Sequence, residues 1–92
     1  MELENRAVEL VGILNECCKF LFVNLFVESF DKAEKVIKDC TPNLNEFKEL
    51  VNALDSESEL YQAQKENLKR FEFLFETSKQ ILAKHRQSES ES

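Results

Sequence analysis

The sequence predicts an all-α protein, because it contains few helix breakers and repeats apolar residues at the spacing of packed helices. It has one glycine and one proline in 92 residues, whereas average proteins contain roughly 12% of the two together. Tight hairpin turns and phosphate-binding loops depend on glycine, so the composition disfavours sheets, P-loops and Rossmann folds. We expect one domain over residues 1–86, built as an elongated helical hairpin or a coiled-coil-like bundle of two long arms.

The first arm is expected over residues 2–40. Its apolar positions recur in the alternating four- and three-residue steps of a coiled-coil seam, first in one register and then in a second: Leu3, Ala7, Leu10, Leu14, Cys17 and Leu21, followed by Phe26, Phe30, Ala33, Ile37 and Cys40. Pro42 lacks a backbone N–H and disfavours helical angles at Thr41. We therefore expect the arm to end near Cys40, with Thr41 as the N-cap of the next helix.

The segment of residues 20–27 is apolar at every position except Asn24. A helix that is apolar on all sides must be surrounded by other elements, and a hairpin covers each of its helices on one side only. We therefore expect other chains to cover this segment. We also hypothesise that Asn24 fixes the register and number of partner helices, as buried asparagines do in coiled coils. The alternative is a break near Gly12 or Asn24 that folds the chain into a compact three- or four-helix bundle.

The second arm is expected over residues 42–54 and 57–86, with a break or kink near residue 55. Ser56 and Glu59 have the spacing of a capping box, which favours the start of a new helix, although a continuous helix is the alternative. Residues 87–92 contain no apolar side chain, so we expect them to form a disordered acidic tail. The seam of this arm contains Leu68, Phe71, Phe75 and Leu82.

The charge balance and the polarity of the longest apolar stretch exclude two function classes. The net charge is −6 and no segment is net basic, whereas nucleic-acid binding depends on clustered lysine and arginine. The most apolar stretch, residues 10–27, contains Glu16 and Lys19, and a charge near the centre of a bilayer costs about 2.5–3.5 kcal/mol. We expect neither a nucleic-acid partner nor a membrane span.

The cysteine pattern indicates a reducing environment. Cys17, Cys18 and Cys40 are odd in number, two of them are adjacent, and the N-terminus lacks the features of a secretory signal. We expect free, mostly buried thiols and a cytoplasmic protein, with the nucleus also open. A disulfide is the alternative.

No catalytic, metal or cofactor site is expected. His85 is the only histidine, no CxxC motif occurs, and Cys17 and Cys18 would point about 100° apart on a helix. A nucleophilic cysteine needs a nearby base or cation, which only Lys19 or His85 could provide. We therefore expect a non-enzymatic protein without a bound cofactor.

One segment of the second arm contains Ala63, Gln64, Lys65, Leu68, Arg70, Phe71 and Glu72. These residues resemble the opening of the KxDL-motif family, whose members are small coiled-coil subunits of hetero-oligomeric complexes that position lysosomes and build lysosome-related organelles. The similarity covers residues 63–72, and the Lys-x-Asp-Leu motif itself is absent. The resemblance implies helical partners and assigns no functional residue.

These observations predict a non-enzymatic helical subunit of an intracellular multi-protein assembly, of the scaffold or tether type. It would bind other helical subunits as a hetero- or homo-oligomer. One alternative is a self-contained bundle that binds an apolar ligand among its phenylalanines, and another is a subunit of a kinetochore-type helical complex. The residues expected to contact partners lie on the seams and in the apolar segment: Leu14, Leu21, Phe22, Asn24, Phe26, Phe30, Leu68, Phe71, Phe75 and Leu82.

Overall fold

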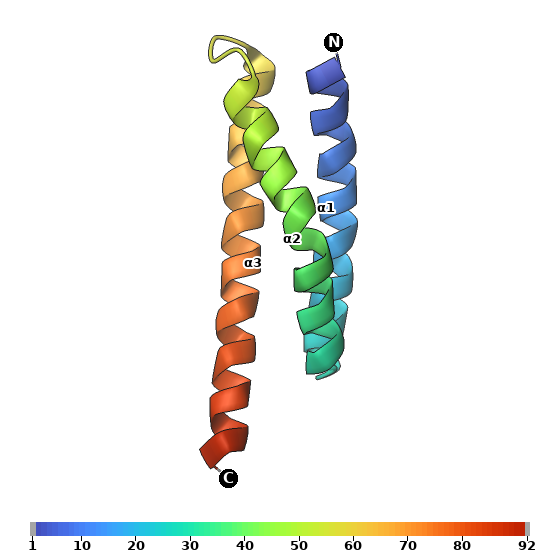
Figure 1. The fold of residues 1–92 in the computed structure, drawn as a ribbon, viewed down its shortest axis with the longest axis vertical. Coiled ribbons are helices and arrows are strands. Elements are labelled where there is room, and N and C mark those ends of the chain that lie inside the picture. The colour runs from blue at the N-terminus through green and yellow to red at the C-terminus, as the bar shows by residue number, and fades with distance from the viewer. Residues whose placement is uncertain (1, 92) are drawn as a thin grey trace.

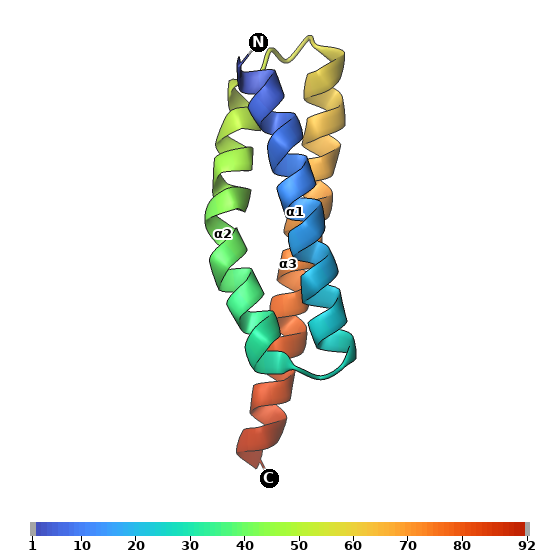
Figure 2. The same cartoon turned by 90° about the vertical axis from the view of Figure 1, so that its right-hand side faces the viewer.

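The computed structural model describes the backbone of residues 2–91 and the side chains of residues 2–87. This part of the chain forms three helices, α1 (Glu2–Phe26), α2 (Phe30–Ala53) and α3 (Glu59–Glu91), and contains no strand. The helices run alternately down, up and down in an elongated bundle of 53 × 17 × 17 Å (Figures 1 and 2). The predicted all-α class is confirmed, and the arrangement is a three-helix bundle.

A turn at residues 27–29 separates α1 from α2. Glu28 adopts a left-handed conformation with φ 60°. The N–H of Ser29 donates to the carbonyl of Asn24 at 2.7 Å, and the N–H of Glu28 donates to the carbonyl of Leu25 at 3.2 Å. These are the two hydrogen bonds of a Schellman motif, which ends a helix. The continuous arm predicted over residues 2–40 is therefore wrong, and the alternative break near Asn24 is confirmed.

The left-handed residue of a Schellman motif is usually glycine, because a side chain costs free energy in that conformation. We expect Glu28→Gly to raise the free energy of unfolding by up to about 1 kcal/mol, since the substitution relieves this cost at an exposed position. Urea-induced unfolding followed by circular dichroism measures the change. The control is Glu9→Gly in the middle of α1, which should lower stability by about 1 kcal/mol. Destabilisation by both substitutions would contradict the left-handed turn.

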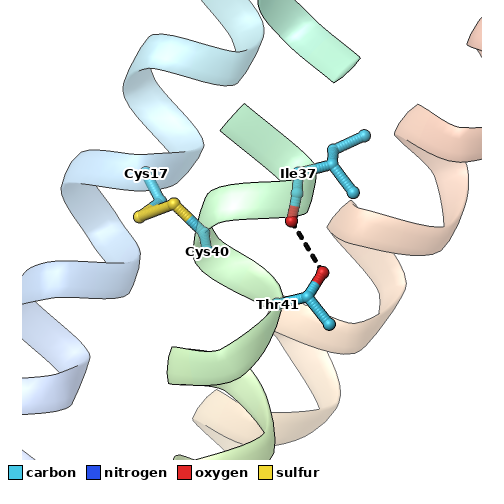
Figure 3. The surroundings of a disulfide bond; sticks show 4 residues. All are labelled: Cys17, Ile37, Cys40 and Thr41. Carbon is cyan, nitrogen blue, oxygen red and sulfur yellow. Dashed lines mark hydrogen bonds between the residues drawn. A yellow bond between two sulfur atoms is a disulfide. The ribbon is translucent and has the colours of Figure 1, made fainter. Parts of the chain in front are cut away.

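Pro42 lies inside α2, so the helix end predicted near Cys40 is wrong. The N-cap role predicted for Thr41 is also wrong, because its Oγ1 donates to the carbonyl of Ile37 one turn earlier at 2.6 Å (Figure 3). The helix persists because buried side chains, among them Ile37 and Phe47, anchor it on both sides of the proline, which is itself exposed. Figure 2 shows α2 bowed, as expected for a helix with an interior proline.

The second break, predicted near residue 55, is confirmed, but its cap differs from the predicted one. Asp55 Oδ1 accepts a hydrogen bond from the N–H of Glu57 at 3.0 Å, which turns the chain after α2. Ser58 Oγ, rather than that of Ser56, accepts from the N–H of Leu60 at 3.2 Å and caps α3.

The end of α3 departs from the predicted tail. The helical backbone continues to Glu91, where a disordered segment was expected over residues 87–92. No proline or glycine follows His85 to end the helix. Ser92 lies outside the described residues. The C-terminal end of α3 extends past the turn between α1 and α2 in both views (Figures 1 and 2).

The core runs along the axis of the bundle. Phe47 of α2 and Phe71 of α3 are both fully buried and pack edge to face, with ring centroids 5.9 Å apart. The two buried polar side chains of the described residues both have hydrogen-bond partners. Gln64 Oε1 accepts from Asn67 Nδ2, and Ser78 Oγ donates to the carbonyl of Leu74. Helix α1 packs most extensively against α2, and the pair α1 and α3 has the fewest contacts.

An ion pair ties the N-terminal half of α1 to α2. Arg6 Nε donates to Glu46 Oε2 at 2.7 Å and Arg6 Nη2 donates to Glu46 Oε1 at 2.9 Å. These hydrogen bonds lower the pKa of the Glu46 carboxyl and raise the pKa of Arg6. This bidentate geometry fixes the relative orientation of α1 and α2 at this point.

We expect the Arg6–Glu46 pair to make stability depend on acidic pH. The pKa of Glu46 is lower in the folded than in the unfolded state, so the pair contributes stability above the unfolded value of about 4.3. That contribution disappears as the pH falls through the folded pKa. Urea unfolding near neutral pH and near pH ~3 should therefore show a larger loss for the wild type than for Glu46→Gln. Equal losses would show that the pair adds no pH-dependent stability.

Candidate interaction surface

The structure divides the predicted partner-binding residues into two groups. The predicted contact residues on the seams, other than Phe26 and Phe30, lie in the bundle's own core, so for them the predicted contact with other chains is wrong in this fold. The cause is the turn at residues 27–29, which folds α2 back so that one chain supplies the helices that cover both seams. The buried seam residues are Leu14, Leu21, Leu68, Phe71, Phe75 and Leu82.

The apolar segment at the end of α1 behaves differently, because most of it faces solvent. Only Leu21 of this segment is fully buried, while Phe26 is 89% exposed and Phe22 is 44% exposed. Exposed apolar side chains that gather on one helix end mark interaction sites. We call this surface the α1 tip, and it consists of Phe20, Phe22, Val23, Phe26 and Val27.

Two further predicted residues border the α1 tip and bond within the chain. Asn24 Nδ2 donates to the carbonyl of Phe20 at 2.8 Å, one helical turn earlier. Phe30 stacks on His85 of α3, with ring centroids 3.8 Å apart and an interplanar angle of 25°. Phe30 therefore anchors the start of α2 on α3. The register-setting role of Asn24 stays a prediction.

A disulfide joins α1 and α2 about one helical turn before the α1 tip. Cys17 and Cys40 are bonded, with their Cα atoms 6.5 Å apart (Figure 3). The prediction of free thiols at these two positions is therefore wrong, and these cysteines no longer indicate a reducing compartment. The bond closes a loop of the chain that contains the whole α1 tip. It holds the helical hairpin that presents this surface.

The third cysteine is buried as predicted. Burial raises the pKa of the Cys18 thiol, and the nearby charge of Arg70 opposes this effect. A raised pKa keeps the sulfur protonated near neutral pH, which makes it a poor nucleophile.

Phe20, Val23 and Val27 belong to the segment that the sequence predicted to be covered by other chains, although they were not among the individually named contact residues. Sequence reasoning missed the Cys17–Cys40 pair, whose only signal is that both cysteines lie about equally far from the turn at residues 27–29. That signal depends on the turn and cannot be read while the arm is taken as continuous.

Within the described residues, no group of His, Cys, Asp and Glu side chains could hold a metal ion. No described helix is both long and apolar enough to cross a bilayer. The fold and surface thus define a small three-helix bundle with an exposed apolar helix end. Comparisons with protein-family models, curated proteins and solved structures give no match to this chain. The resemblance of residues 63–72 to the KxDL-motif family stays a prediction.

Proposed function

We propose that this protein is a non-enzymatic helical subunit of a multi-protein assembly and that it binds other helical proteins through the α1 tip. The observation that supports this most directly is the exposure of large apolar side chains around the last turns of α1. The bundle has already formed its own core, so these side chains are not needed for internal packing. Their burial by a partner supplies the free energy of binding.

The free energy of burying the tip favours a protein partner. Burying one Phe or Val side chain contributes about 1.5–3 kcal/mol, so a partner that covers Phe20, Phe22 and Phe26 gains several kcal/mol. Such aromatic anchors are typical of the residues that dominate binding energies at interfaces. Charges of both signs lie near the tip, among them the exposed Glu16 and Lys19. A mixed rim suits a polar protein surface better than an anionic membrane or a nucleic acid.

Charge insertion at the tip tests this function. We expect Phe22→Asp and Phe26→Asp each to abolish co-purification of partner proteins from the native source, because each places a charge in an interface that is otherwise apolar. Both side chains are exposed in the bundle, so the thermal unfolding of the isolated chain should change little. Quantitative affinity purification of tagged variants measures the loss.

The matched control is Phe73→Asp, since Phe73 is 68% exposed on α3 and lies outside the tip. This variant should retain every partner. Retention of all partners by both tip variants would contradict the proposed function of the tip.

The alternative of a bundle that binds an apolar ligand finds less support. Phe47 and Phe71 fill the core by direct contact with each other. The hollow beside Phe73 and Leu44, about 470 Å³ in volume, is a groove between α2 and α3 with charged residues such as Lys48 on its rim. Ligand pockets usually enclose most of the ligand, whereas this groove is open to solvent.

A further inference from the structure

A second seam runs along the outer side of α1, away from the core. Its residues recur in the alternating four- and three-residue steps of a coiled coil, and all are exposed. The apolar members lie at its ends, with Val8 58% exposed near one end and Phe22 and Phe26 at the other. The seam consists of Val8, Gly12, Asn15, Lys19, Phe22 and Phe26.

Gly12 in the middle of this seam has no role inside the bundle. A Cβ atom placed on it would have no atom within 4 Å beyond those of its chain neighbours and of the surrounding helix backbone. Glycine in a helix interior costs about 1 kcal/mol relative to alanine, and no described residue of the bundle packs closely enough to require it here. Gly12 is also the only glycine of the sequence. It leaves a flat site on α1 that a bulky side chain of another helix can fill.

The seam is complementary to itself when two copies run antiparallel. Pairing centred on residue 17 places Phe22 of one copy opposite Gly12 of the other. The same pairing sets Phe26 against Val8 and Lys19 against Asn15. The largest side chains thus meet the glycine and the valine, as knobs-into-holes packing needs. Lys19 also comes beside Glu16 of the second copy, where it can form an ion pair between copies.

The bundle leaves room for this second helix beside α3. Helices α1 and α3 run in the same direction and have the fewest contacts of the three pairs. Arg70 donates to Asn15 at 3.3 Å, which sets their register and brings Ile81 of α3 level with Phe26. Ile81 is 44% exposed. An antiparallel helix along the seam would therefore also cover apolar surface of α3.

We propose that the partner of this surface is a second copy of the same chain, docked through an antiparallel α1–α1 pair with Phe22 seated on Gly12 of the other copy. The inference rests on the proposed function, because it names the helical partner of the α1 tip. Phe20, Val23 and Val27 lie outside the paired seam and stay available to further subunits.

The test is a steric block and its rescue, measured by light scattering after size exclusion over a range of concentrations. The wild type should form a dimer. Gly12→Phe should weaken dimerisation about tenfold or more, because its ring occupies the site of Phe22 from the other copy. Position 12 is exposed and a Cβ there meets open space in the single bundle, so the melting temperature of the dilute protein should not fall. The double variant Gly12→Phe with Phe22→Ala exchanges the large and small partners and should restore dimerisation.

Phe73→Asp is the control and should dimerise like the wild type. A wild type that stays monomeric, a dimer unaffected by Gly12→Phe, or a double variant without rescue would each overturn the self-pairing. If the wild type is monomeric while Phe22→Asp still abolishes co-purification of other proteins, self-pairing fails and the proposed function stands. If neither effect occurs, both fail.

Discussion

Replacement of Phe47 by alanine should lower the free energy of unfolding by about 3–5 kcal/mol. The side chain is fully buried in α2 and packs edge to face on Phe71 of α3, with ring centroids 5.9 Å apart. Removing it creates a cavity where α2 meets α3, a pair of helices with fewer contacts than α1 and α2. Because each kcal/mol shifts the melting temperature of such a small domain by several degrees, we expect a fall of roughly 15 °C or more.

Phe73→Ala is the matched control, since it removes the same group from a residue that is 68% exposed. It should change stability by no more than about 0.5 kcal/mol. Both variants can be compared by thermal and urea unfolding followed by circular dichroism. A loss at Phe47 no larger than that at Phe73 would show that Phe47 lies outside the core.

Reduction of the Cys17–Cys40 disulfide should lower the free energy of unfolding by about 3 kcal/mol. The bond joins residues 23 positions apart, and closing a loop of this length restricts the unfolded chain by an amount of that order. Urea unfolding with and without a dithiol reductant measures the difference. The folded bundle should persist after reduction, because its core is formed by side chains of all three helices.

The double variant Cys17→Ser with Cys40→Ser should show the lowered stability without reductant and no response to it. Cys18→Ala is the control, since Cys18 forms no disulfide, and this variant should keep the full response. Equal stability of the wild type with and without reductant would show that the thiols are free, as the cysteine pattern alone indicated.

The disulfide also bears on binding, because the α1 tip lies within the loop that it closes. A binding surface that is held in its bound conformation loses less entropy on association. The bond joins α1 to α2 close to the residues that a partner would cover. It therefore contributes to the shape of the tip as well as to stability.

The sequence by itself determined the helical class, the break near residue 55 and the apolar character of the α1 tip. Scarcity of glycine and proline and the repeated apolar spacing are local properties, and local properties decide whether a segment is helical. For the same reason, the sequence alone could predict Phe22 and Phe26 as residues that contact a partner. No internal helix can cover apolar groups that point in every direction around one helix end.

Tertiary structure decided where the first arm breaks. The turn at residues 27–29 has Glu28 in a conformation that usually requires glycine, so the sequence carries no ordinary signal for it. Conversely, the proline signal at residue 42 was misleading, because packing on both sides of Pro42 keeps α2 helical. In both places the burial of several side chains outweighs a local preference of about 1–3 kcal/mol.

The remaining features follow from that turn. Folding α2 back on α1 buries Leu14 and Leu21 inside one chain, and brings Cys40 opposite Cys17. Seam spacing shows that such residues need a partner helix, but it is the same for a helix of another chain and for one of the same chain. Only the position of the turn distinguishes the two, and that position depends on the packing of the whole bundle.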